Sequence, residues 1–266
     1  METATQADWT ADLQLIRDAA RQAGEIALKF FRRSPEVWWK NEGRSPVSAA
    51  DYAANECLES MLRGARPGYG WLSEETDDDV ARLGHDTLFV VDPIDGTRGF
   101  INGLEMWCVS VAVVHRGRPV AGVLVAPALE EEFCAGLAGD ALKNGRPVAV
   151  SPPDPARRQK FAAAEEMVSK FEPAFRATIE RAKHVPSLAY RLAMVADGRL
   201  DGTLVKRNSH DWDLAAADLI LARAGGQLVD LDGAPLSYNR PEVTHGTLCA
   251  AGESRLPEIL EHLRRI

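Results

Sequence analysis

Apolar residues recur with two different spacings in the first half of the chain. Over residues 13–30 and 48–63 they return every three or four positions, which is the spacing of one buried face of a helix. Between and after these segments, shorter apolar runs are typical of strands. The expected strands are residues 70–73, 87–91, 107–115, 119–126 and 131–135. The short polar turn at residues 116–118 joins two of them and predicts a β-hairpin.

The second half mixes helices and strands more evenly. We expect helices at residues 170–182, 187–196, 212–224 and 256–265, and strands at residues 161–164, 202–205, 227–230 and 247–250. The Pro-rich stretch at residues 151–155 predicts a boundary between an N-terminal α+β part, residues 1–150, and a C-terminal α/β part, residues 151–266. Because the elements alternate without a strict βαβ repeat, the pattern predicts a mixed, layered α/β protein.

Composition and charge exclude several kinds of partner. The 266 residues are 45% apolar and carry a net charge of −8, which argues against a nucleic acid polymer as ligand. No apolar run approaches the roughly 20 residues that cross a bilayer, so we expect no membrane partner. The first residues lack the basic and apolar regions of a signal peptide, which favours a cytoplasmic location.

The four cysteines predict neither a zinc site nor a redox centre. They stand far apart among apolar neighbours and form no C-x-x-C pair. We therefore expect free, buried thiols.

One hexapeptide, residues 92–97, carries the clearest chemical signal. It reads Asp-Pro-Ile-Asp-Gly-Thr and directly follows the apolar run at residues 87–91. Asp92 and Asp95 supply the hard oxygen ligands that divalent cations prefer, and Gly96 and Thr97 can present backbone N–H groups to an anion. Taken alone, the same residue types also suit an ordinary surface turn.

Other acidic residues follow or begin predicted elements. Glu74 and Glu75 directly follow the strand at residues 70–73. Because adjacent strand residues face opposite ways, one would bind a metal directly and the other would support it. The alternative is that both belong to the acidic surface run at residues 77–79. Asp213 and Asp51 lie near helix starts, where acidic residues also stabilise the helix dipole without any metal.

Three segments together resemble the signatures of the inositol monophosphatase-like superfamily. They are residues 74–75, the hexapeptide at 92–97, and Trp212-Asp213 followed after one residue by two alanines, in the family's order and spacing. These proteins are magnesium-dependent, lithium-sensitive phosphomonoesterases. The resemblance extends from the first helix to the final strand. It implies a layered α/β/α/β/α sandwich of the inositol monophosphatase and fructose-1,6-bisphosphatase type, with metals between the two parts.

The resemblance also implies a role for each motif residue. Two or three Mg²⁺ ions would be held by the carboxylates of Glu74, Asp92, Asp95 and Asp213 and by the backbone carbonyl of Ile94, with Asp51 and Glu75 as support. Glu74 with Thr97 would orient and deprotonate the attacking water. Asp95 and Asp213 would hold a metal beside the leaving oxygen, and Asp92 would bridge metals. A loop containing Lys40 would close over the site.

The substrate is predicted from positions around these motifs. The expected substrate-binding residues are Gly96, Thr97, Arg98, Arg191, Lys206 and Asp213. Arg191, Lys206 and Arg207 favour a second anionic group on the substrate, although Lys206 and Arg207 also suit solvated charges at a strand end. Residues 187–198 and 117–127 resemble CysQ-type 3′(2′),5′-bisphosphate nucleotidases, which implies 3′-phosphoadenosine 5′-phosphate.

Other functions stay open at this point. Inositol 1-phosphate and histidinol phosphate are the alternative substrates, and a catalytically weak metal- or nucleotide-binding module is the non-enzymatic alternative. Arg98, directly after the hexapeptide, departs in some respect from the pattern of each substrate type. We expect a small phosphorylated substrate and either a monomer or a homodimer.

Overall fold

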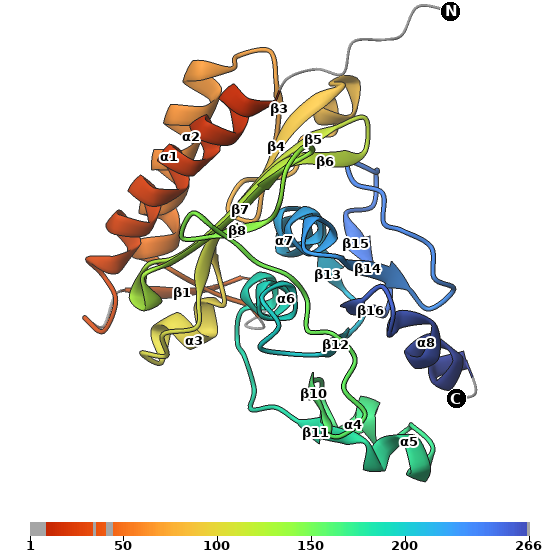
Figure 1. The fold of residues 1–266 in the computed structure, drawn as a ribbon. Helices are drawn as coiled ribbons and strands as arrows, with labels where there is room; N and C mark the ends of the chain where they lie inside the picture. Colours follow the sequence, from red (N-terminus) through yellow and green to blue (C-terminus); the bar gives the residue numbers. More distant parts are fainter. Residues whose placement is uncertain (1–8, 34–35, 41–44, 265–266) are drawn as a thin grey trace, which may run out of the picture.

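The structure is a computed structural model that describes residues 9–33, 36–40 and 45–264. Helices and sheets alternate in five layers (Figure 1). A pair of helices covers one face of a seven-stranded sheet, and a second pair lies between that sheet and a five-stranded one. Short helices cover the outer face of the second sheet. The layered α/β/α/β/α architecture expected from the sequence is therefore confirmed.

The first sheet is built from the N-terminal half of the chain. Its strand order is β3-β4-β5-β6-β7-β8-β9, with β3 parallel to β4 and each later pair antiparallel. The hairpin predicted at residues 116–118 is confirmed as the β5–β6 turn. The strands are β3 (Gly70–Ser73), β4 (Thr87–Asp95), β5 (Cys108–His115), β6 (Arg118–Ala126), β7 (Glu131–Gly136), β8 (Leu142–Lys143) and β9 (Arg146–Pro147).

Strand β4 shows why the apolar run at residues 87–91 is buried on both faces. Phe89 and Val91 pack against α1 (Thr10–Leu28) and α2 (Ala49–Ala65), whereas Leu88 and Val90 belong to the core on the opposite face. Successive side chains of a strand point to opposite faces, so a strand between two helical layers must be apolar throughout. The strand is thus fixed firmly before its chain reaches Asp92.

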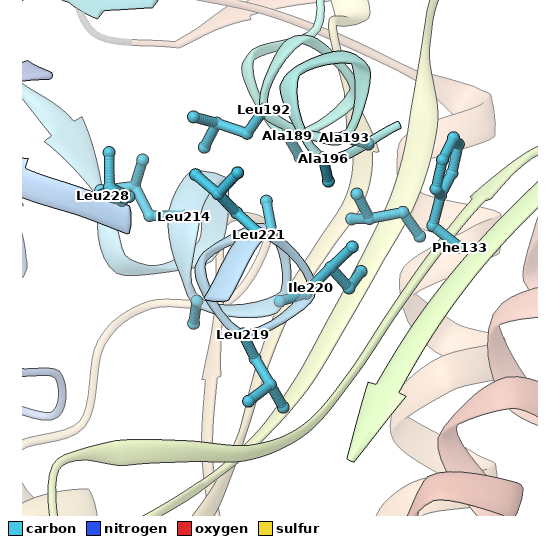
Figure 2. Close-up of a cluster of buried hydrophobic side chains, with 14 of the residues drawn as sticks. Phe133, Ala189, Leu192, Ala193, Ala196, Leu214, Leu219, Ile220, Leu221 and Leu228 are labelled. Atoms are coloured by element: carbon cyan, nitrogen blue, oxygen red, sulfur yellow. The ribbon is translucent and has the colours of Figure 1, made fainter. Parts of the chain in front are cut away.

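The central layer consists of α6 (Leu188–Ala196) and α7 (Asp211–Arg223). Figure 2 shows the two helices end-on, with alanines of α6 and leucines and Ile220 of α7 between them and the neighbouring strands. Phe133 reaches this core from β7, and Leu228 reaches it from the second sheet. Because α7 contributes to a core shared with both sheets, its N-terminal end is held at a fixed place relative to β4.

The second sheet has the order β11-β10-β12-β16-β14. Strands β11, β10 and β12 are parallel, and β16 pairs antiparallel with both β12 and β14. Parallel neighbours end at the same edge of a sheet, so the segments after these three strands come together. The strands are β10 (Gln159–Ala162), β11 (Ile179–Arg181), β12 (Gly202–Val205), β14 (Gly226–Asp230) and β16 (Leu248–Gly252), and the outer helices are α4 (Glu165–Val168), α5 (Pro173–Ala177) and α8 (Leu256–Arg264).

Shorter elements complete the described chain. Two strand pairs stand apart from the large sheets, β1 with β2 and β13 with β15. These elements and the remaining short helices are β1 (Val37–Lys40), β2 (Ser45–Ser48), β13 (Ser209–His210), β15 (Thr244–His245), α3 (Thr97–Ile101), η1 (Val80–Gly84) and η2 (Pro127–Leu129).

The helix predicted at residues 170–182 is wrong. The structure has the short α5 there, followed directly by strand β11. Pro173 can begin a helix because its first turn needs no backbone donor, but Ile179 and the two residues after it pair in parallel with β10 instead. Residues 179–181, whose local pattern favours a helix, therefore form the edge strand of the second sheet.

Two other predictions concern the loop and the domain boundary. Residues 37–40 and 45–48 form an antiparallel strand pair, so Lys40, which the prediction placed in the loop, ends strand β1 instead. Residues 41–44, and with them the expected closure, lie outside the described residues. The predicted boundary at residues 151–155 falls between the strands of the first and second sheets, and the division into two parts stays a prediction.

The cysteines and the helices agree with the remaining expectations. All four cysteines are free, with Cys108, Cys134 and Cys249 buried and Cys57 half-buried, so the predicted free thiols are confirmed and the predicted burial holds for three of the four. Among the described residues, no helix combines the length and the apolar character needed to cross a membrane.

A half-buried acid on α7 makes the stability of the fold sensitive to pH. Asp218 accepts a hydrogen bond of 2.8 Å from the hydroxyl of Tyr238, which is itself buried. Burial raises the pKa of Asp218 to about 6, although Tyr238 and the charges of Arg118 and His245 oppose the shift. Between the ordinary carboxyl pKa and this value, the folded protein holds a proton that the unfolded chain has lost, so the free energy of unfolding falls as the pH rises.

We predict that Asp218→Asn stabilises the protein at pH 8 by about 1–3 kcal/mol, because the uncharged amide still accepts the Tyr238 hydrogen bond. The gain over the wild type should shrink towards pH 4, where the carboxyl group is protonated in the folded protein. Urea unfolding at a series of pH values measures both. The matched control is Asp140→Asn, at an exposed position. A gain that is independent of pH, or equal in the control, contradicts the assignment.

Candidate active site

Three of the predicted site residues converge where the two halves of the chain meet. Asp92 and Asp95 end strand β4, and Asp213 lies in the first turn of α7. Each offers one carboxylate oxygen, and these three oxygens lie within 4.8 Å of one another. Asp92 and Asp95 are buried, and Asp213 is half-buried. We call Asp92, Asp95 and Asp213 the carboxylate cluster.

The backbone of the hexapeptide explains how β4 brings both of its acids to one place. The pairing of β4 with β5 shifts register between Asp92 and Asp95, so that the strand bulges there. The backbone N–H of Ile94 donates to the Asp92 carboxylate at 3.0 Å, which fixes the turn. Gly96 follows with φ +96°, and a Cβ atom there would lie 3.1 Å from the backbone of Ser187. Both its conformation and the close approach therefore require glycine.

Burial and mutual repulsion make ionisation of the carboxylate cluster unfavourable. The pKa of Asp92 is raised well above its ordinary value by burial and then by the charges of Glu74, Asp95 and other nearby acids. Burial and the charge of Asp213 raise the pKa of Asp95 to about 7. Carboxylates crowded out of water in this way are stable as anions only with a positive partner.

Helix α6 begins at the carboxylate cluster. Its N-cap residue, Ser187, donates its hydroxyl to Asp95, and the backbone N–H of Ala189 donates to the same carboxylate oxygen at 2.6 Å. These donors oppose the pKa rise of Asp95 but do not cancel it. The sequence did not single out Ser187 for this contact, because it lies 92 positions from Asp95 and only the fold brings them together.

A buried polar network fixes the start of α7. The carboxylate of Asp211 lies 2.7 Å from the Nε2 atom of His245 and accepts the backbone N–H of Asn239 at 2.9 Å. Two positions further on, Asp213 accepts the backbone N–H of His210 at 2.7 Å. The helix start is therefore tied to β15 and to the loop before it, which holds the Asp213 carboxylate in place.

Thr97 and Asp51 form a hydrogen-bonded group behind the hexapeptide. The Thr97 hydroxyl lies 3.1 Å from the Asp51 carboxylate and 3.0 Å from the carbonyl oxygen of Ile94, either of which can accept a hydrogen bond from it. Asp51 also caps α2 by accepting from the backbone and hydroxyl of Ser48. Burial raises the Asp51 pKa, although these hydrogen bonds oppose the shift. The predicted support residue thus contacts the predicted catalytic threonine.

Glu74 and Glu75 lie directly after β3, the strand parallel to β4. The backbone N–H of Glu74 donates to the carbonyl oxygen of Val91 at 3.2 Å. The chain after β3 therefore still runs alongside β4 at Val91, the residue before Asp92. Both glutamates are half-buried, and the charges of both raise the Asp92 pKa. They are near the carboxylate cluster but not in the group of three, so their roles as ligand and support stay predictions.

A cavity of about 460 Å³ adjoins the carboxylate cluster and shares Asp213 with it. It opens at the edge where β10, β11 and β12 end, the place where α/β sheets commonly bind ligands. Among the described residues that line it, five are Arg or Lys and one, Asp213, is acidic. The cationic residues are Arg181, Lys183, Arg191, Lys206 and Arg207.

The predicted substrate residues differ in their relation to this cavity. Arg191 and Lys206 line it, whereas Arg98 is exposed on α3 and does not. The Nε atom of Arg191 and the hydroxyl of Ser209 are buried and have no hydrogen-bond partner in the part of the chain that the structure describes. Both residues line the cavity, so a ligand could satisfy these groups.

Sequence analysis missed two of the five cations, Arg181 and Lys183. The wrongly predicted helix at residues 170–182 placed Arg181 within a helix and Lys183 just after it. The structure instead places them at and after the end of β11, on the cavity edge. Only the parallel pairing of β11 with β10 brings them there.

The residues of the carboxylate cluster fit a magnesium ion. Its donors are carboxylate oxygens, with neither His nor Cys in the group, and hard oxygen ligands suit Mg²⁺ better than zinc. The raised pKa values of Asp92 and Asp95 show that the protein alone does not balance these charges. Asp92, Asp95 and Asp213 are the residues that would hold the ion.

Comparison with known proteins gives a consistent result. The sequence model of the inositol monophosphatase family matches residues 8–266. The chain is 31% identical to an inositol-1-monophosphatase of Mesorhizobium japonicum over 84% of this chain and 87% of that protein. It is 33% identical to a histidinol-phosphatase of Chlorobaculum parvum (84% and 87% covered) and 32% identical to a 3′(2′),5′-bisphosphate nucleotidase CysQ of Aggregatibacter actinomycetemcomitans (86% and 88%).

The fold comparison agrees with the sequence comparison. The structure matches the extragenic suppressor protein SuhB of Bartonella henselae with a TM-score of 0.82 and 26% identity, covering 96% of this chain and 98% of that one. Relatives named for different activities thus share about the same identity with this chain, so identity alone does not select a substrate. The match over nearly the whole length establishes that the chain belongs to the inositol monophosphatase family, a family of phosphatases.

Proposed function

We propose that this protein is a Mg²⁺-dependent phosphomonoesterase that hydrolyses 3′-phosphoadenosine 5′-phosphate to AMP and phosphate. The observation that carries the proposal is the carboxylate cluster next to a cavity with five cationic side chains. The carboxylate cluster suits metal-assisted phosphoryl chemistry, and the cations suit a substrate with a second phosphate.

In the proposed mechanism, the carboxylate cluster and its neighbours transfer one phosphoryl group from the substrate to water. Bound Mg²⁺ would supply Lewis-acid stabilisation of the phosphoryl charge and of the leaving oxygen. Glu74 and Thr97 orient the attacking water, and a carboxylate oxygen of Glu74 accepts its proton. Gly96 and Thr97 direct backbone N–H groups at the phosphate, and Asp51 holds the Thr97 hydroxyl. No covalent bond between the protein and phosphate is needed.

The charge of the cavity supports a bisphosphate over the alternative substrates. Inositol is a neutral polyol, so it would bring no negative charge to a cavity lined by five cations. Histidinol carries an ammonium group, which these cations would repel. A second phosphate pairs with them, and Arg191 brings a buried donor with no partner among the described residues.

We expect Asp95→Asn and Asp213→Asn each to lower Mg²⁺-dependent phosphate release by about 100-fold or more, since each removes a charged metal ligand. Asp218→Asn is the matched control, because it makes the same change to a half-buried acid of α7 outside the carboxylate cluster. Circular dichroism and thermal unfolding show whether the variants keep the fold. Full turnover in either cluster variant would overturn the metal assignment.

A pair of substrates that differ only in the second phosphate tests the specificity. We expect 3′-phosphoadenosine 5′-phosphate to exceed 3′-AMP in kcat/KM by about 10- to 100-fold, the range for one charged hydrogen-bonded contact. Inositol 1-phosphate and histidinol phosphate should be poorer still. Equal rates for the matched pair, or a preference for inositol 1-phosphate, contradict the nucleotide proposal. Absence of phosphate release from every substrate would favour a binding module.

A further inference from the structure

Two acidic residues outside the carboxylate cluster form ion pairs with cations that line the cavity. Helix α4 follows β10 after a short link and lies beside β11 (Figure 1). Its Glu165 pairs with Arg181 at 2.8 Å, and its Glu166 pairs with Lys206 at 2.6 Å. Arg181 ends β11 and Lys206 follows β12, so the two ion pairs connect the ends of the three parallel strands.

The cations on this edge are therefore not equivalent. Arg181 and Lys206 are each paired with a glutamate, whereas Lys183 and Arg207 form no ion pair with any other described residue. The close Lys206 ammonium also lowers the pKa of Glu166, so this acid stays charged over the working range of pH. Helix α4 thus offsets part of the positive charge where a ligand would enter.

Both ion pairs are exposed to solvent, so an anionic ligand can replace the glutamates beside Arg181 and Lys206. The side chains of Arg181 and Glu165 are 47% and 72% exposed, and those of Lys206 and Glu166 are 58% and 70% exposed. Exposed ion pairs contribute little net stability because water screens them and ordering two long side chains costs entropy. A phosphate dianion offers more charge and a better hydrogen-bonding geometry to the same cations, particularly to a guanidinium.

We propose that Glu165 and Glu166 lower the affinity of the cavity for anions by occupying Arg181 and Lys206 until a second, dianionic group of the substrate displaces them. Because the glutamates compete with every anion, they also keep the cavity from retaining the product and inorganic anions. The inference rests on the proposed function for its substrate, but not for the competition itself.

Anion binding tests the competition without catalysis. Glu165→Gln, Glu166→Gln and the double variant are titrated with inorganic sulfate by calorimetry, with EDTA present so that no metal contributes. We expect sulfate to bind about threefold more tightly for each glutamate removed, the range for exposed ion pairs. Glu258→Gln on α8 is the control, since it makes the same charge change at an exposed position that does not line the cavity. Equal sulfate affinity in wild type and double variant overturns the inference, and so does an equal gain in Glu258→Gln.

Kinetics then separates this inference from the proposed function. In the double variant we expect a lower KM for 3′-phosphoadenosine 5′-phosphate and stronger inhibition by its product 5′-AMP, with an unchanged KM for 3′-AMP. An equal fall in KM for both substrates would mean a general charge effect and contradicts competition between the glutamates and the second phosphate. If the wild type hydrolyses no bisphosphate, the proposed function fails, while the sulfate titration still decides whether the glutamates compete with anions.

Discussion

Crowding of negative charge is the constraint on which the rest of the site depends. Asp92, Asp95 and Asp213 bring their oxygens within 4.8 Å of one another, with two of the three side chains buried. Repulsion and desolvation would drive these groups apart or keep them protonated unless a cation joined them. The fold resists that separation because each acid is held from a different direction: Asp92 by its own turn, Asp95 by the start of α6, and Asp213 by the start of α7.

The layered fold makes this convergence possible. Strand β4 is buried between two helical layers, and α7 is buried between two sheets, so neither end can move to relieve the repulsion. The same arrangement places the ends of β10, β11 and β12 beside Asp213. Negative charge for a metal and positive charge for an anionic substrate therefore meet at one helix start. This complementarity distinguishes the site from a surface patch of mixed charges.

Most of the architecture could be predicted from the sequence, because apolar spacing determines which faces are buried. The hexapeptide at residues 92–97 could also be found, since it directly follows a buried apolar run and stands in order with two other acidic motifs, at residues 74–75 and 212–213. The sequence could not indicate that Ser187 donates to Asp95, because this contact depends on the packing of α6. Residues 179–181 were likewise predicted as helix, because their strand forms only through pairing with the edge of β10. The cavity cations Arg181 and Lys183 were missed for the same reason.

The most direct test of the account is a crystal structure of the protein grown with Mn²⁺, which replaces Mg²⁺ at oxygen sites and can be located by its anomalous scattering. The account predicts anomalous peaks about 2.0–2.3 Å from carboxylate oxygens of Asp92, Asp95 and Asp213, a distance typical of divalent cations with oxygen ligands. A structure in which Mn²⁺ binds elsewhere, or in which the three carboxylates remain without metal at saturating Mn²⁺, would contradict it.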